Sequence, residues 1–137
     1  MGIRAAEGTD PARSVLMVDD DPQRIGLVRQ ALVALGQPLV LMVISHPAEL
    51  RLYLEDTMRL SRPPAAIVVH VDNPAVVALL AWIRIQRNRI ADIPIISIGS
   101  DVRQLHPNPI DAAQSPTAEL LLNALRRAVQ KRSANGN

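Results

Sequence analysis

The segment SVLMVDDDP, residues 14–22, holds the features that decide the fold. Its first part, Ser14–Val18, is almost entirely apolar, which is typical of a parallel strand that helices cover on both faces. Three aspartates from Asp19 to Asp21 follow directly, and Pro22 has the fixed φ that suits the first position of a helix. The segment therefore predicts a buried strand, an acidic strand end and a helix start.

The same order of elements repeats along the chain. Three further apolar runs predict strands, and a weaker pattern predicts a fifth; they are Leu39–Ile44, Ala65–Val71, Ile93–Ile98 and, for the fifth, Ile110–Gln114. Between the strands, apolar residues recur every three or four positions, as in amphipathic helices. Alternation of this kind with right-handed crossovers predicts an α/β fold with a doubly wound parallel sheet, whose functional crevice lies at the carboxyl ends of the strands.

Proline begins several of the predicted helices. In two of them an Asp or Asn precedes the proline, as Asp21-Pro22 and Asn73-Pro74. Such a side chain can accept hydrogen bonds from the backbone N–H groups of the first helical turn. We therefore predict Asp21 and Asn73 as helix caps.

Composition limits the class of protein. The 137 residues suffice for one domain, predicted over residues 13–131, with polar tails at 1–12 and 132–137. Cysteine is absent, which excludes disulfides and thiolate sites and favours a cytoplasmic location. A net charge of +2 without a basic block, with only one Trp and one Tyr, gives no support for nucleic-acid binding, and no apolar run is long enough to span a membrane.

The aspartate triplet is the main candidate for chemistry. Asp19 and Asp20 are expected at the end of the sheet where such folds bind ligands. Their mutual repulsion calls for a counter-charge, and a hard divalent cation such as Mg²⁺, which prefers carboxylate and water ligands, would supply it. The alternative is that Asp21 caps the helix while the other two carboxylates are simply solvated.

The succession SVLMVDDDP, PPAAIVVHVDNP, ADIPIISIGS and DAAQSP resembles the receiver domain of two-component response regulators over residues 14–130. The resemblance implies a flavodoxin-like, five-stranded parallel sheet of order 2-1-3-4-5. It also implies that Asp19 and Asp20 are the acidic pair that binds Mg²⁺. Because the interval from Gly99 to Ser115 is shorter than in most receivers, we expect the fourth helix to be shortened or missing.

Other functional positions of that family are changed in this chain. The phosphoacceptor aspartate, four residues before a proline, corresponds to His70. The switch hydroxyl corresponds to Gly99, the lysine to Ser115 and the switch aromatic to Ala112. Aspartyl phosphorylation needs a carboxylate nucleophile with a metal ion and an ammonium group to neutralise the phosphoryl charge. The resemblance therefore implies a pseudo-receiver whose Mg²⁺ site is vestigial or metal-free.

His70 and Asp72 leave alternatives open. A protonated His70 paired with Asp20 would supply the missing positive charge from within the chain, whereas a buried His70 held by hydrogen bonds would have only a structural role. Phosphorylation of His70 itself is disfavoured, because an imidazolium behind two carboxylates is not nucleophilic. Asp72 is the outside candidate for a displaced phosphoacceptor, although its place beside Asn73 indicates a loop residue.

These observations support one principal interpretation of function. The chain is interpreted as a stand-alone signal-transduction module, not an enzyme, that contacts a histidine kinase or a downstream signalling protein without aspartyl phosphorylation; a homodimer is compatible with this role. One alternative is a working single-domain response regulator phosphorylated at Asp72, with Mg²⁺ on Asp19 and Asp20. Another is a small flavodoxin-like ligand binder or enzyme that uses the crevice beside Asp19 and Asp20.

Overall fold

A parallel β-sheet forms the centre of the structure, a computed structural model that describes residues 13–59, 63–86, 89–98, 111–113 and 117–135. The strands are β1 (Ser14–Val18), β2 (Val40–Ile44), β3 (Ala66–His70), β4 (Ile95–Ile98) and the short β5 (Asp111–Ala113). They are ordered β2-β1-β3-β4-β5, and each neighbouring pair is parallel. The predicted parallel order 2-1-3-4 is confirmed.

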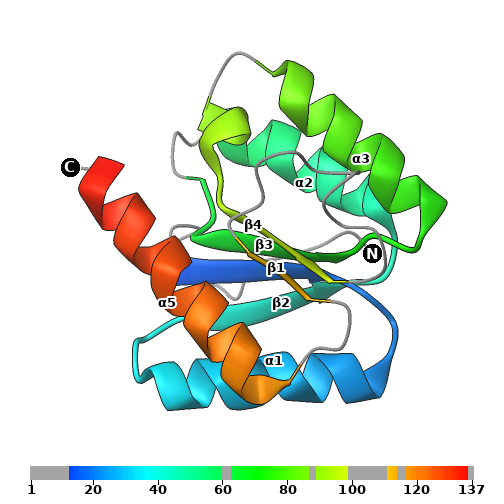
Figure 1. Cartoon of the computed structure of the whole chain (residues 1–137). Coiled ribbons are helices and arrows are strands. Elements are labelled where there is room, and N and C mark those ends of the chain that lie inside the picture. Colours follow the sequence, from blue (N-terminus) through cyan, green and yellow to red (C-terminus); the bar gives the residue numbers. More distant parts are fainter. Residues whose placement is uncertain (1–12, 60–62, 87–88, 99–110, 114–116, 136–137) are drawn as a thin grey trace.

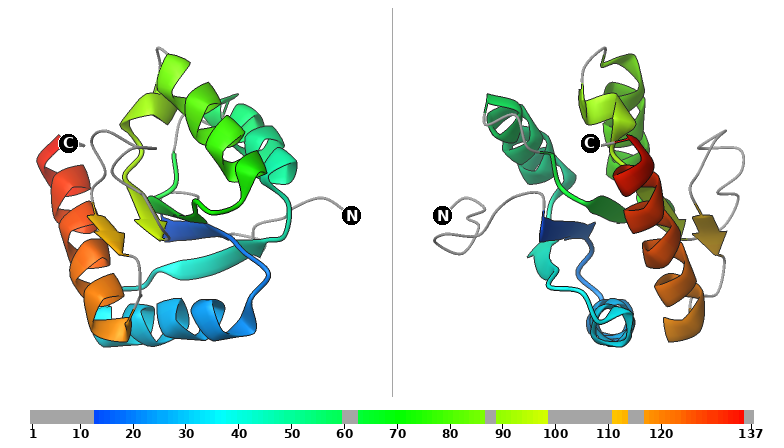
Figure 2. Two further views of the ribbon diagram at one scale, coloured as in Figure 1. Left: turned by 45° about the vertical axis from the view of Figure 1, so that its right-hand side comes forward. Right: turned by 90° about the vertical axis from the view of Figure 1, so that its left-hand side faces the viewer.

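Helices cover both faces of this sheet (Figure 1, Figure 2). On one face, α1 (Pro22–Leu35) packs beside α5 (Ala118–Asn135). On the other, α2 (Pro47–Arg59) packs beside α3 (Pro74–Ile85) and a short 3-10 helix, η2 (Arg89–Asp92). No helix of the described segments is long and apolar enough to cross a membrane. The expectation for the fourth helix concerns residues between β4 and β5 and lies outside the described residues.

Alternate residues of the central strands belong to two separate hydrophobic clusters. Side chains of a strand point to opposite faces in turn, so an apolar run is needed where both faces are covered. The cluster under α2 and α3 includes Leu16, Val18, Ile67 and Val69. The cluster under α1 and α5 includes Val15, Met17, Ala66 and Val68. This alternation also decides which polar residues at the strand ends face α1.

Two helices begin with the same local geometry. Asp21 and Asn73 are the N-caps of α1 and α3, and each side-chain oxygen accepts a hydrogen bond of 2.9 Å from the backbone N–H two residues later, that of Gln23 or Ala75. Each cap satisfies a donor that the first helical turn leaves without an intrahelical partner. The caps direct the chain from the ends of β1 and β3 into their helices, which fixes the loops that carry the candidate site.

A buried hydroxyl in β4 gives a first stability prediction. Within the described residues, the hydroxyl of Ser97 is buried and has no hydrogen-bond partner. Such a group loses its hydration without compensation, so Ser97→Ala should raise the free energy of unfolding by about 1 kcal/mol. Urea unfolding would measure the change, and Ser45→Ala, at an exposed position, should stay within about 0.5 kcal/mol of the parent chain. A loss of stability in Ser97→Ala would show that the hydroxyl makes a favourable contact.

Candidate functional site

The candidate site lies at the carboxyl ends of the adjacent strands β1 and β3. Val18 pairs with Val69, so Asp19 and His70, the next residue on each chain, lie at the same level of the sheet. Backbone hydrogen bonds continue past the strand ends, from the N–H of Asp19 to the carbonyl of Ile44 at 3.2 Å and from the N–H of Val71 to the carbonyl of Ile98 at 2.8 Å. The sheet therefore holds the backbone of both site residues in place.

Asp19 is buried and its carboxylate is enclosed by donors. Its Oδ1 accepts hydrogen bonds from the backbone N–H groups of Asp20 at 2.8 Å and Asp21 at 3.0 Å. The guanidinium of Arg24 donates a hydrogen bond to each oxygen, from Nε to Oδ2 at 2.7 Å and from Nη2 to Oδ1 at 3.0 Å. A two-pronged contact between planar guanidinium and carboxylate groups is the strongest geometry available to this pair.

Arg24 also reaches the third carboxylate of the triplet. Its Nη1 lies 3.0 Å from Oδ2 of Asp21, so one guanidinium is shared by two aspartates. Burial raises the pKa of Asp19, but the hydrogen bonds from Arg24, Asp21 and Asp20 and the charge of Arg24 outweigh it and hold that pKa below its usual value. The pKa of Arg24 is raised in turn by its hydrogen bond to Asp19, against the opposing effect of burial.

The place of Arg24 on its helix is unusual. It is the third residue of α1, close to the positive end of the helix dipole, where an acidic side chain is favoured and a cation is not. The first turn of α1 contains no acidic residue. The two carboxylate contacts therefore offset an unfavourable position, which indicates that local helix preferences do not account for an arginine here.

Arg24 is the site residue that the sequence analysis missed. The expected counter-charges for the aspartates were Mg²⁺ or His70, and no role was assigned to Arg24. The sequence nevertheless carries a signal for it, because Asp21 and Arg24 are three residues apart at a helix start, a spacing that brings side chains together.

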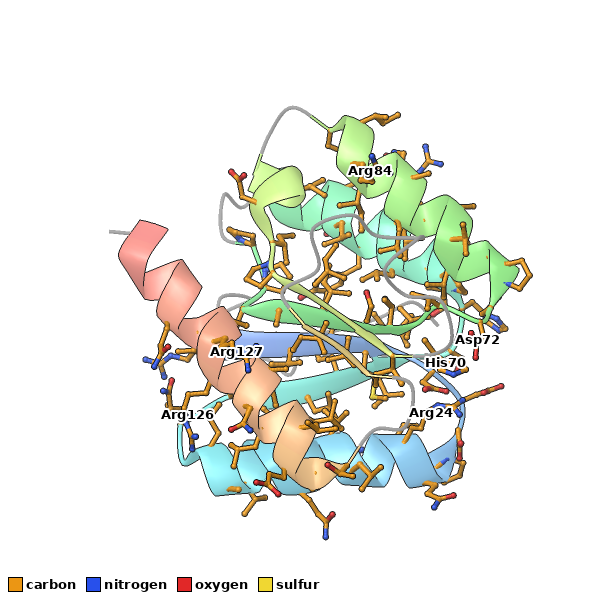
Figure 3. All side chains as sticks on the ribbon, in the orientation of Figure 1. Arg24, His70, Asp72, Arg84, Arg126 and Arg127 are labelled. Atoms are coloured by element: carbon orange, nitrogen blue, oxygen red, sulfur yellow. The ribbon has the colours of Figure 1, made fainter. Side chains whose placement is uncertain are left out.

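His70 lies beside Asp72 and not beside Asp20. Its Nε2 is 3.5 Å from Oδ2 of Asp72, and the pairing of His70 with Asp20, one of the alternatives left open by the sequence, is not found among the described residues. Strand alternation places His70 on the face of α1, as it does Asp19, whereas Asp20 is exposed. Figure 3 shows Arg24, His70 and Asp72 at the same end of the sheet.

The remaining predicted positions are less informative. Ala112 lies in β5, where it pairs with Ser97 of β4. Gly99 and Ser115, the positions expected to correspond to the switch hydroxyl and the lysine, lie outside the described residues. The described part of the site is therefore the aspartate triplet with Arg24, together with His70 and Asp72.

These residues do not fit a divalent cation as they are arranged. Within the described segments, no group of three or more His, Cys, Asp or Glu side chains is placed to hold a metal ion. Mg²⁺ requires oxygen ligands in near-octahedral geometry, but both oxygens of Asp19 already accept hydrogen bonds from Arg24, and Oδ1 accepts two more from the backbone. A cation bound to Asp19 would have to displace Arg24.

Comparisons with known proteins identify the class of fold. No protein-family model and no curated protein matches the chain. Among solved structures, the signal receiver domain of a histidine kinase from Syntrophus aciditrophicus has a TM-score of 0.70 at 21% identity, over 92% of this chain and 95% of that one. A putative response regulator from Chloroflexus aurantiacus has a TM-score of 0.68 at 16% identity, over 86% of this chain and 98% of that one. The chain therefore has the fold of response-regulator receiver domains.

A third similar structure bears on the metal question. The response regulator Rcp1 in its Mn²⁺-bound form has a TM-score of 0.62 at 16% identity, over 88% of this chain and 92% of that one. Binding of a divalent metal is thus recorded for a protein of this fold. At such identities the similarity shows the fold alone, and the chemistry of this chain has to be argued from its own residues.

Proposed function

We propose that the chain is a pseudo-receiver, a signal-transduction module that acts through contacts with other proteins and not through aspartyl phosphorylation. The observation that carries the proposal is the position of His70. This residue ends β3, level with Asp19, where the resemblance to receivers expects the phosphoacceptor aspartate. An imidazole there, in contact with Asp72, supplies no carboxylate nucleophile.

The surroundings of Asp19 support the same conclusion. A phosphoryl group brings negative charge, which a transfer site must neutralise with cations. In the described structure the cation that contacts the triplet is Arg24, and its guanidinium already binds both Asp19 and Asp21. Asp19 itself is buried and fully engaged, so it is unsuited to attack a phosphoryl donor. The positive charge of Arg24 is thus already taken up by the carboxylates of Asp19 and Asp21, and the site offers little stabilisation to an incoming phosphoryl group.

A second candidate function follows from the exposure of Asp72. Its side chain is 46% exposed and adjoins the imidazole of His70, which would be a neighbouring cation when protonated. Phosphorylation of Asp72 would make the chain a working single-domain response regulator with a displaced acceptor. We favour the pseudo-receiver, because Asp72 follows the end of β3 in a loop and has no divalent cation site beside it in the described structure.

The proposal extends to partners and location. Receiver domains relay signals between proteins, so a histidine kinase or a downstream signalling protein is the expected partner, and a homodimer fits the same role. The absence of cysteine suits a reducing cytoplasm. The module would respond to partner binding as an equilibrium between conformations, without a covalent change.

Intact mass spectrometry tests the proposal. The chain is incubated with Mg²⁺ and acetyl phosphate, beside an Asp72→Asn variant and an authentic receiver domain as a positive control. We expect the positive control to gain one phosphoryl group while the parent chain and the variant keep their mass. An adduct on the parent chain that is absent from Asp72→Asn would establish the displaced acceptor, and an adduct on both would place phosphorylation elsewhere; either result overturns the pseudo-receiver.

A further inference from the structure

We propose that Arg24 is a built-in counter-cation that occupies the place of a divalent metal ion at the aspartate triplet and thereby excludes metal from Asp19. The inference goes beyond the proposed function, because it concerns the metal dependence of the site whether or not any residue is phosphorylated. It rests on the contacts of Arg24 with Asp19 and Asp21.

The geometry of the contacts is the first support. Two nitrogens of Arg24 bind the two oxygens of Asp19 at 2.7 and 3.0 Å, and the third nitrogen lies 3.0 Å from Asp21. All three nitrogens of the guanidinium are therefore directed at carboxylates. The side chain of Asp19 is only 3% exposed, so water and a hydrated cation have little access to it while Arg24 is in place.

Competition with a free cation favours the arginine. Arg24 is five residues from Asp19 on the same chain and one helical turn from Asp21, so its guanidinium is present at a high effective concentration. A Mg²⁺ ion would have to lose part of its hydration shell, which it does reluctantly, and would also have to displace Arg24. The tethered guanidinium loses far less hydration, because guanidinium is weakly hydrated.

The charge pattern is consistent with this role. Three adjacent carboxylates repel one another, and α1 has no acidic residue in its first turn that would add to the repulsion. Arg24 replaces the acidic residue that a helix start favours and brings one positive charge to the triplet. The site consequently keeps one charge state whatever the concentration of free Mg²⁺, and contacts that partners make with this end of the sheet should be insensitive to Mg²⁺.

Direct measurement of Mn²⁺ binding tests the inference. Mn²⁺ is titrated into the folded full-length chain and followed by electron paramagnetic resonance of the free ion, with folding of every variant checked by circular dichroism. We expect no saturable binding by the parent chain and saturable binding by Arg24→Ala, so that the apparent dissociation constant falls at least about ten-fold. Arg24→Gln, which keeps a long polar side chain without the charge, serves the same purpose if Arg24→Ala does not fold.

Control variants locate the effect. Arg29→Ala removes an exposed arginine from the same helix and should bind no more Mn²⁺ than the parent chain. Arg24→Ala combined with Asp19→Asn should lose the binding that Arg24→Ala gains. Saturable binding by the parent chain, absence of binding in both charge-removing variants, or unchanged binding in the double variant would each overturn the inference.

Discussion

Arg24→Ala should lower the free energy of unfolding by about 2–4 kcal/mol, because it leaves the buried carboxylate of Asp19 without its charged partner. The side chain of Asp19 is 3% exposed, and its two neighbours in the triplet are also acidic. Arg24 is 26% exposed, so water can replace part of the lost interaction and the effect should fall short of that for a fully buried pair. Two backbone N–H groups still bind Asp19, which also moderates the loss.

Urea unfolding of matched variants would measure this effect. Arg29→Ala, the exposed arginine on the same helix, should change stability by no more than about 0.5 kcal/mol. Arg24→Ala combined with Asp19→Asn should be less destabilised than the sum of the two single variants, since the unpaired buried charge is gone. A loss below about 0.5 kcal/mol in Arg24→Ala would mean that the ion pair contributes nothing measurable.

Acid should remove the stabilisation that Asp19 provides. The pKa of Asp19 in the folded chain lies below its usual value of 3.8, so the unfolded chain binds a proton there at a higher pH than the folded chain does. The contribution is therefore complete above 3.8 and is lost as the pH falls through the lower, folded-state pKa. The sign follows from linkage: stability rises with pH wherever the unfolded state holds more protons.

The comparison with Asp19→Asn isolates this contribution from that of other carboxylates. The difference in unfolding free energy between the parent chain and Asp19→Asn should be constant at pH values above about 5 and should shrink as the pH is lowered below 3.8. Urea midpoints measured across that range would give the profile. Parallel profiles down to the lowest pH at which both chains fold would contradict a depressed pKa for Asp19.

Sequence patterns predicted the scaffold of the site well. Apolar runs locate β1 to β4 because helices cover both faces of the sheet. The side chains of such a strand are buried on both faces, so few of its positions tolerate a polar residue. Asp21-Pro22 and Asn73-Pro74 identify helix starts, since cap and proline preferences act over two residues and depend little on tertiary packing. Local and periodic signals were sufficient for these features.

Partners within the site were harder to predict. The contact of Arg24 with Asp19 spans five residues across a strand–helix junction, where the direction of the side chain depends on how the loop turns. The pairing of His70 was left open because the register between β1 and β3 was not known. That register puts Asp19, not Asp20, level with His70, and leaves His70 in contact with Asp72, two residues further along its own chain.

The most direct test of a site that works without metal or phosphate is an NMR titration of the isotopically labelled chain with Mg²⁺ and beryllofluoride, a phosphoryl mimic. We predict that the amide signals of residues 19–21 and 70–72 do not move beyond the changes that matched concentrations of KCl and KF produce. Saturable shifts confined to those residues would contradict the pseudo-receiver and would show that the site binds the metal and the phosphoryl mimic.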